Sequence, residues 1–245
     1  MKTYKADLHI HSVLSPCGDL DMSPRNIVEY AKAQNLQIIA VTDHNSTLHG
    51  PLVRKLASPF GISVLFGAEV TSKEEAHCIC LFDSEEQRVS FQDFINKNLP
   101  DFPNDPSKFG HQVVVNENDE IVDEITSLLI TALKVGINDI EKKVHELDGL
   151  FIPAHVDRPI YSLISQLGFI PPDLKFDALE IFRTTNAIEF KAKHKYLKNP
   201  ALIKNSDSHY PYQIGSTFTT YILEAPTCAE LRLAFNEQEG RGIVC

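Results

Sequence analysis

The chain alternates short apolar β-prone runs with segments of helical periodicity along most of its 245 residues. The first run is YKADLHIH at 4–11, and LQIIAVTDH at 36–44 follows a helix that Ser23 is expected to cap. Later runs are GISVLFGAEV, HCICLF, LFIPAHV, DALEIF and ALIKNSDSH. This order predicts an α/β fold with a mostly parallel sheet and right-handed crossovers. At this length we expect a single barrel-like domain over 1–245.

One segment, 83–136, interrupts the alternation. It contains a helical pattern at 90–99 and the polar turn NEND at 116–119, which separates two β-prone runs and predicts a hairpin. We interpret 83–136 as an insertion at the rim of the barrel, where it could act as a lid.

Possible metal ligands lie at one end of each predicted strand. Because side chains alternate along a strand, His9 and His11 share one face of the first run. The later runs carry, in chain order, Asp43, His44, Glu69, His77, His155, Asp207 and His209. Barrel enzymes assemble their sites at the carboxyl ends of strands, so these side chains are expected to converge. Imidazoles and carboxylates are ligands for zinc, manganese and iron, and a metal centre is therefore predicted.

Composition limits the partners and the compartment. The net charge of −10 argues against stable nucleic-acid binding, although a nucleotide or a strand end could be held by metal ions. The N-terminus MKTYKADLHIH lacks the apolar core of a signal peptide, and no run is long enough to span a membrane. We expect a cytoplasmic protein without membrane contacts.

Five scattered cysteines form no disulfide framework, which fits a reducing compartment. Cys78 and Cys80 are expected to be small buried residues. Cys17 lies close to the predicted site, where it could be a ligand or an oxidation-sensitive neighbour. The oligomeric state cannot be read from the sequence.

The segments DLHIHS, VTDHN, GAEVTSKEEAHCICLF, IPAHVD and NSDSH, in this order over 7–209, resemble the PHP family. This is the polymerase and histidinol phosphatase domain family of metal-dependent phosphoesterases. The resemblance implies a distorted (β/α)7 TIM-like barrel with a trinuclear metal centre at the carboxyl ends of its strands. It also implies two to three divalent ions per chain, of zinc, manganese or iron.

The resemblance assigns ligands by position. The first metal would be held by His9, His11, Glu69 and Asp207. A second metal would share Glu69 and add His77 and His155. The third would take Asp19, His44 and His209.

The run SPCGDLDMSP departs from the family's usual SDG pattern. Counting back from the helix-starting SP puts Asp19 in register, and Asp21 is the alternative. Asp7 and Asp43 adjoin ligating histidines and are expected to orient imidazoles, although Asp43 could instead point away.

These residues favour a hydrolase acting on phosphoric ester bonds of a small phosphorylated substrate, a phosphomonoester or a nucleotide. A hydroxide bridging two metals would attack phosphorus, because coordination lowers the pKa of water to about 7. Glu69 would be the shared catalytic ligand, and Arg158 and Arg183 are expected to contact phosphate oxygens. The alternatives are a 3′ exonuclease or oligonucleotide phosphodiesterase, and a non-catalytic metal-stabilised binding module.

Overall fold

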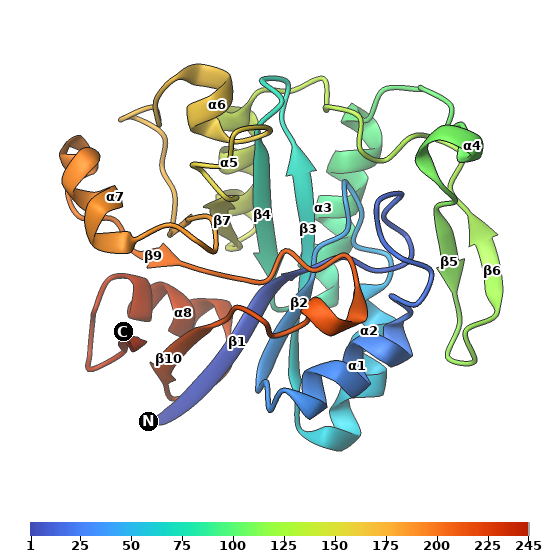
Figure 1. Ribbon diagram of the computed structural model, residues 1–245, viewed down its shortest axis with the longest axis horizontal. Coiled ribbons are helices and arrows are strands. Elements are labelled where there is room, and N and C mark those ends of the chain that lie inside the picture. The colour runs from blue at the N-terminus through green and yellow to red at the C-terminus, as the bar shows by residue number, and fades with distance from the viewer. Residues whose placement is uncertain (245) are drawn as a thin grey trace.

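The computed structural model describes residues 1–244, with a curled seven-stranded sheet at its centre in the order β11-β10-β1-β2-β3-β4-β7 (Figure 1). These strands are β1 (Lys2–Ile10), β2 (Ile38–Val41), β3 (Ser63–Thr71), β4 (His77–Phe82), β7 (Leu150–Pro153), β10 (Thr219–Leu223) and β11 (Gly242–Val244). Two smaller sheets pair β5 (Val113–Val115) with β6 (Ile121–Glu124) and β8 (Leu179–Glu180) with β9 (Leu202–Ile203).

Helices flank this sheet. The longer ones are α1 (Pro24–Ala33), α2 (Gly50–Ala57), α3 (Glu85–Asn98), α5 (Ile137–Glu146) and α8 (Cys228–Phe235). The shorter ones are α4 (Pro106–Phe109), α6 (Leu163–Leu167), α7 (Ala187–Lys193) and the 3₁₀ turns η1 (Ser58–Phe60), η2 (Lys195–Leu197) and η3 (Pro211–Gln213). Ser23 caps α1 as predicted, because its side chain accepts a hydrogen bond from the backbone N–H of Asn26. Within 1–244, no helix combines the length and apolar character needed to cross a membrane.

The sheet is mixed, which corrects the expectation of a mostly parallel one. Strands β1, β2 and β3 are parallel, whereas β4 is antiparallel to β3 and β7, and β10 is antiparallel to β1 and β11. Residues 72–76 alone connect β3 to β4. This connection is too short for a helical crossover, so the chain must return antiparallel. A complete (β/α)7 barrel stays a prediction.

Backbone hydrogen bonds attach the small pair β8 and β9 to strands on both sides. The N–H of Val156, after β7, donates to the carbonyl of Glu180 at 2.8 Å. The N–H of His11, after β1, donates to the carbonyl of Ser208 at 3.0 Å. The ends of β7, β8, β9 and β1 therefore lie together, although they are far apart in the sequence.

Side-chain alternation in the sheet divides the apolar core into layers. On β4, Ile79 packs in the cluster that contains Leu8 of β1. Cys78 and Cys80 face the opposite cluster, which contains Phe91 of α3. Both cysteines are fully buried, as the sequence predicts.

The segment 83–136 has two different parts. Helix α3 packs Phe91 and Ile95 into the core, and both are 0% exposed. Further along, α4 and the predicted hairpin β5–β6 stand at the right edge of the molecule in Figure 1. Val113 and Val115 of β5 pack on Val13, which fixes the hairpin against the loop after β1. That the whole segment is an insertion or a lid stays a prediction.

Candidate metal centre and adjoining pocket

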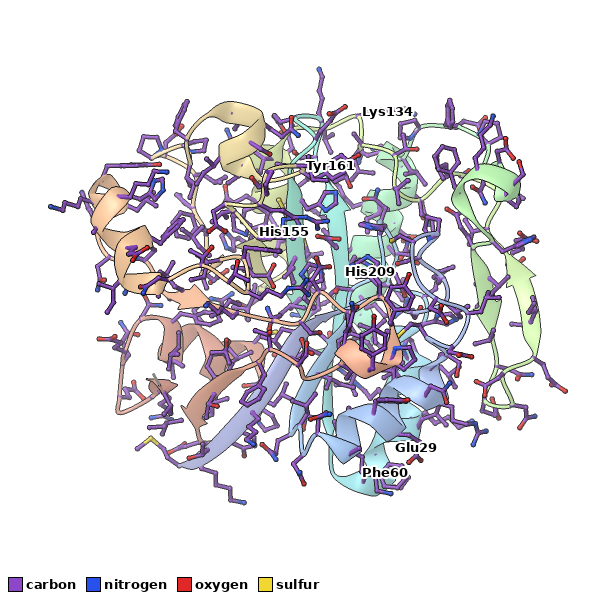
Figure 2. The ribbon with its side chains drawn as sticks, viewed as in Figure 1. Glu29, Phe60, Lys134, His155, Tyr161 and His209 are labelled. Carbon is purple, nitrogen blue, oxygen red and sulfur yellow. The ribbon has the colours of Figure 1, made fainter. Side chains whose placement is uncertain are left out.

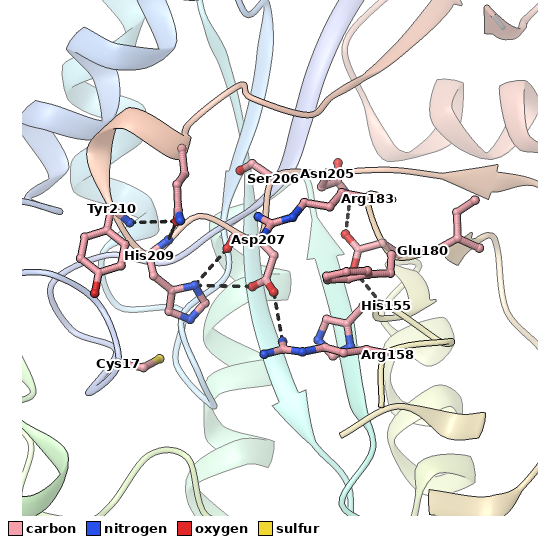
Figure 3. A pocket seen from close by; sticks show the side chains of 13 residues that line it. Cys17, His155, Arg158, Glu180, Arg183, Asn205, Ser206, Asp207, His209 and Tyr210 are labelled. Carbon is pink, nitrogen blue, oxygen red and sulfur yellow. Dashed lines mark hydrogen bonds and ion pairs between the residues drawn. The ribbon is translucent and has the colours of Figure 1, made fainter. Parts of the chain in front are cut away.

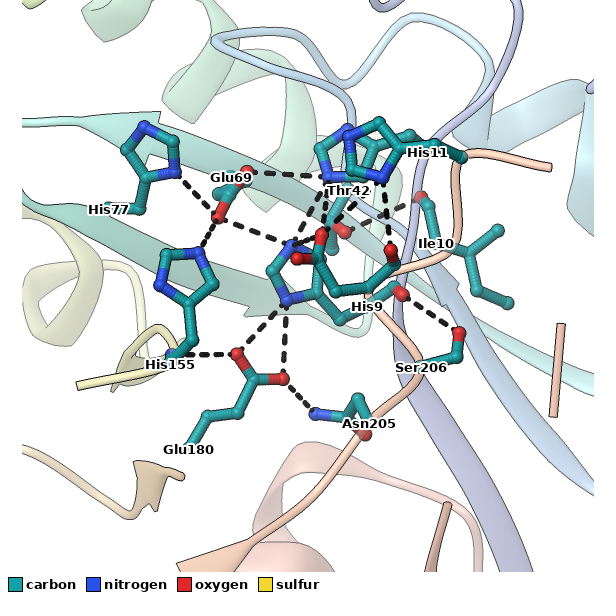
Figure 4. A network of polar contacts seen from close by, with 12 residues as sticks. His9, Ile10, His11, Thr42, Glu69, His77, His155, Glu180, Asn205 and Ser206 are labelled. Atoms are coloured by element: carbon teal, nitrogen blue, oxygen red, sulfur yellow. Dashed lines mark hydrogen bonds and ion pairs between the residues drawn. The ribbon is translucent and has the colours of Figure 1, made fainter. Parts of the chain in front are cut away.

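The carboxylate of Glu69, near the end of β3, lies at the centre of a buried histidine cluster (Figure 4). Ring nitrogens lie 2.9 to 3.3 Å from its oxygens and belong to His9, His11, His44, His77 and His155. Glu69 is 1% exposed. Separate strand ends supply these side chains, so the predicted convergence is present in the structure.

Asp207 and His209 follow β9 and border this cluster. Oδ1 of Asp207 lies 3.5 Å from Nε2 of both His9 and His11. The ring of His209 stacks on that of His11, with centroids 4.3 Å apart. Figure 2 shows His209 and His155, from separate segments, near each other over the sheet.

Two of these positions have unusual backbone conformations. The φ angle is +27° at His155 and +50° at Asp207. Residues with a Cβ rarely adopt positive φ, and such strain is often found at functional sites. The backbone is therefore strained at two of the proposed ligand positions.

Glu180 of β8, which sequence reasoning missed, orients His9. Its carboxylate oxygens lie 3.1 and 3.2 Å from Nδ1 of His9. They also accept hydrogen bonds from the N–H of His155 at 2.9 Å and from Nδ2 of Asn205 at 2.8 Å. In the neutral tautomer whose Nδ1 donates to Glu180, the lone pair of Nε2 of His9 would face the cluster. A carboxylate inside the apolar run DALEIF was the available signal, because burial of an unpaired charge is costly.

Asp43 acts on His11 through a hydroxyl group. Its Oδ1 accepts hydrogen bonds at 2.7 Å from the N–H of Ser12 and from Oγ of Ser15. The same Oγ lies 3.0 Å from Nδ1 of His11. Asp43 is therefore placed to orient an imidazole, with one intervening hydroxyl.

The carboxylate of Asp7 accepts hydrogen bonds from backbone N–H groups and, within 1–244, contacts no imidazole that it could orient. Its carboxylate accepts hydrogen bonds from the N–H groups of Ser206 at 3.1 Å and Gly215 at 2.9 Å. Burial raises the pKa of Asp7 to about 6. Its contacts fix the segment that carries Asp207, which differs from the predicted role.

His49 is a second residue near the cluster that sequence reasoning did not find. It is buried, its Nδ1 lies 2.7 Å from Oγ of Ser12, and its Nε2 accepts a hydrogen bond from the N–H of Val115 at 3.1 Å. It thus links the hairpin β5–β6 to the loop beside the cluster.

The donor sets fit divalent cations. Within 1–244, three groups have donor atoms within 4.8 Å of one another: His9, His11 and Glu69; His44, Glu69 and His77; and His11, Cys17, His44 and His209. Nδ1 of His155 is buried and has no hydrogen-bond partner among the described residues. Mixed nitrogen and oxygen donors suit zinc, manganese and iron alike.

Asp19 is not in these groups. Its carboxylate accepts a hydrogen bond from the N–H of Asp21 at 2.9 Å, and so stabilises its own turn. Asp21, the alternative, is exposed. The structure brings Cys17 to the cluster instead.

The surroundings hold Glu69 and some of the histidines in the protonation states that bind metals. Although burial raises it, the neighbouring His77 and His9 hold the pKa of Glu69 well below its ordinary value. Burial lowers the pKa of His209 to about 4, so its ring is neutral at pH 7. Burial also lowers the pKa of His44. An ionised carboxylate and neutral imidazoles are the protonation states that bind metals. Burial lowers the pKa of His9 and His11, but the neighbouring carboxylates outweigh it and raise the pKa of His9 well above its ordinary value and that of His11 to about 9. Metal binding to these two rings would therefore release protons.

A cavity of about 410 Å³ opens beside the cluster (Figure 3). Arg158 and Arg183 line it, as do Phe182 and Tyr210. Nη1 of Arg158 donates to Oδ2 of Asp207 at 3.2 Å. The guanidinium of Arg183 lies 5.5 Å from the ring centre of Phe182. Both predicted arginines therefore reach the wall of one cavity, where they could contact an anion.

We predict that Glu180→Gln weakens cation binding about 10- to 100-fold, the usual effect of losing an outer-shell partner of a ligating histidine. A neutral amide stabilises the Nδ1 proton of His9 less than a carboxylate does. Competition titration against a chromophoric chelator measures the change. Glu189→Gln, an exposed substitution in α7, is the matched control. Equal affinities for the wild type and Glu180→Gln would contradict the orienting role.

The fold and the site together define an α/β protein with a buried histidine–carboxylate cluster beside an arginine-lined cavity. The PHP domain profile matches residues 7–161, so the chain belongs to the PHP family. The predicted resemblance is confirmed.

The chain is also similar to several known proteins. An uncharacterized protein of Methanocaldococcus jannaschii is 38% identical over 90 residues, which are 34% of this chain and 52% of that protein. The lesion-specific endonuclease EndoQ of Pyrococcus furiosus superposes with a TM-score of 0.72 at 24% identity, over 99% of this chain and 58% of its own. A two-domain Bacteroides vulgatus protein with a predicted PHP-like metal-dependent phosphoesterase has a TM-score of 0.56 at 17% identity, over 99% and 65%. The chain thus spans little more than half of the first two relatives.

One prediction needs correction. A second Endonuclease Q structure, with a TM-score of 0.74 at 23% identity over 99% of this chain and 58% of that one, holds a 27-mer duplex with an abasic lesion at the active site. The prediction that stable nucleic-acid binding is excluded is therefore wrong. It relied on the net charge of the whole chain, whereas binding depends on the local field of a site. Charges more than about 10 Å away are largely screened at 0.1 M salt.

Proposed function

We propose that this chain is a metal-dependent phosphoesterase that hydrolyses a small phosphomonoester or a nucleotide. The observation that carries the proposal is the convergence of five imidazoles on Glu69 beside the cavity that Arg158 lines. The cavity, at about 410 Å³, is in the size range of small-ligand sites. A distorted (β/α)7 barrel and a cytoplasmic location are part of this proposal.

Two to three divalent ions of zinc, manganese or iron are the proposed cofactors. His9, His11, Glu69 and Asp207 would hold the first, and Glu69 with His77 and His155 the second. His44 and His209 would contribute to a third. When bound, such ions lower the pKa of water to about 7 and offset negative charge on the phosphate.

The protein's own groups would bind and orient the substrate. Arg158 is 31% exposed at its side chain, and its contact with Asp207 fixes the guanidinium at the edge of the cluster. Its remaining N–H groups can donate to phosphate oxygens. Glu180 and Asp43 would keep His9 and His11 in the orientation and tautomer that the centre requires.

A second candidate is hydrolysis of a phosphodiester in a nucleic acid strand, by an exonuclease or oligonucleotide phosphodiesterase. The exposed rings of Tyr210 and Tyr212 stack with centroids 5.7 Å apart, and Tyr210 lines the cavity. Exposed aromatic rings beside arginines suit stacked bases and their phosphates. The duplex in the Endonuclease Q structure also favours this candidate.

The test combines elemental analysis with hydrolysis assays before and after chelation. The substrates are an aryl phosphate, nucleoside monophosphates, a bis-aryl phosphodiester and end-labelled oligonucleotides. We expect two to three ions per chain and chelator-sensitive release of phosphate from monoesters. Preference for the diester or the oligonucleotides would favour the second candidate. Bound metal without any hydrolysis would instead indicate a non-catalytic binding module.

A further inference from the structure

We infer that Cys17 supplies a thiolate ligand to the third cation site, in place of the carboxylate of Asp19, and thereby favours a thiophilic cation such as zinc there. The inference rests on the proposed function, because it concerns the same centre. It adds a sulfur donor to a ligand set otherwise composed of nitrogen and oxygen.

The first support is the position of the sulfur. Sγ of Cys17 and ring nitrogens of His11, His44 and His209 all lie within 4.8 Å of one another. Tetrahedral zinc with bonds of 2.0–2.3 Å places its donors roughly 3.3–3.8 Å apart. The limit of 4.8 Å is wider than this spacing, so the donors would have to move closer together when a cation binds.

The second support is the state of the two neighbouring histidines. Nδ1 of His44 is buried and makes no hydrogen bond to a described residue, although it lies 3.2 Å from an oxygen of Glu69. Nδ1 of His209 lies 3.0 Å from the carbonyl oxygen of Asp207, and the contact leaves the lone pair on Nε2. Nε2 of His11 lies 3.3 Å from Glu69 and belongs to the first group. His44 likewise belongs to the group of Glu69 and His77, so His209 is the histidine that the Cys17 group does not share with another group.

The loop that carries Cys17 is fixed by its backbone. A Cβ at Gly18 would lie 2.4 Å from the carbonyl oxygen of Ser12, so only glycine allows this close approach. The N–H of Gly18 donates to the carbonyl of Ser15 at 2.8 Å, and the N–H of Asp19 donates to that of His209 at 2.9 Å. This turn holds Cys17 near His209, on the cavity wall that both line (Figure 3).

A thiolate would change the preference of the site. Soft sulfur ligands favour zinc and similar ions, whereas an all-carboxylate or carbonyl set suits magnesium and manganese. Binding would replace the S–H bond of Cys17 with a sulfur–metal bond and release one proton to the buffer.

Cobalt(II) substitution and thiol labelling test the assignment in the full chain. We expect cobalt loading to produce a near-ultraviolet thiolate-to-cobalt charge-transfer band that Cys17→Ser abolishes and Asp19→Asn retains. Zinc loading should slow iodoacetamide alkylation of Cys17 at least tenfold, as followed by peptide mass mapping. Cys17→Ser should also lower zinc content by one ion per chain. Because Cys17 is exposed, Cys17→Ser should fold, and circular dichroism confirms this.

The outcomes separate this inference from the proposed function. Metal-dependent hydrolysis without a Cys17-dependent band would overturn the thiolate assignment and leave the phosphoesterase proposal standing. A full charge-transfer band without any phosphoester hydrolysis would support the thiolate assignment and overturn the phosphoesterase proposal. Loss of one zinc ion in Asp19→Asn but not in Cys17→Ser would also overturn it, in favour of Asp19.

Discussion

Replacing Glu69 with glutamine is expected to lower kcat/KM for the best phosphoester substrate at least about 100-fold, the scale of losing one electrostatic contact at a reacting centre. The carboxylate lies within 3.3 Å of five ring nitrogens, and no other single group joins so many of the proposed ligands. An amide has no negative charge to share between two cations, and its NH₂ group would face the lone pairs of the imidazoles. Steady-state kinetics with saturating manganese or zinc measures the effect.

Glu29→Gln is the matched control, because it makes the same chemical change at an exposed position of α1 (Figure 2). It should leave kcat/KM within experimental error of the wild type. Circular dichroism and thermal melts of both variants check that the fold is kept. Turnover by Glu69→Gln at the wild-type rate would contradict the proposal that Glu69 is a shared ligand.

Removing the bound cations is expected to abolish hydrolysis and to destabilise the fold. The imidazoles and carboxylates of the cluster would lose the partner that they share, while remaining buried. A ligand at 100 times its Kd stabilises the folded state by about 2.7 kcal/mol, so a loss of this order should follow chelation. Thermal melts and aryl phosphate assays report the two effects on the same sample. Adding back zinc or manganese should restore both.

Glu69→Gln provides the internal control for the melts, since its cation-dependent stabilisation should be much smaller than that of the wild type. The opposite finding would be a protein that binds no cation under any loading condition and melts identically with and without chelator. The histidines at the strand ends would then not form a metal centre, and family membership would indicate the fold alone.

Most of the proposed ligands could be predicted from the sequence, because the positions of strand ends depend on local residue patterns. Apolar runs determine where strands lie, and alternation determines that His9 and His11 share a face. Carboxyl ends of neighbouring parallel strands meet at one edge of a sheet, so His44 and Glu69 could be predicted to converge. A local pattern could mark Glu180 as a carboxylate inside an apolar run, but it could not show that this residue orients His9, which lies 171 residues away.

The sequence by itself thus determined the α/β class and most of the buried cluster, because both depend on periodicity and on residue types at strand ends. It indicated the family through the resemblance of its ligand-bearing segments. The tertiary structure decided which direction β4 runs, which carboxylates orient the imidazoles, and that Cys17 rather than Asp19 faces His209. These features depend on loop paths and on contacts between distant segments. Such contacts arise only when the whole chain has packed, and no window of sequence contains them.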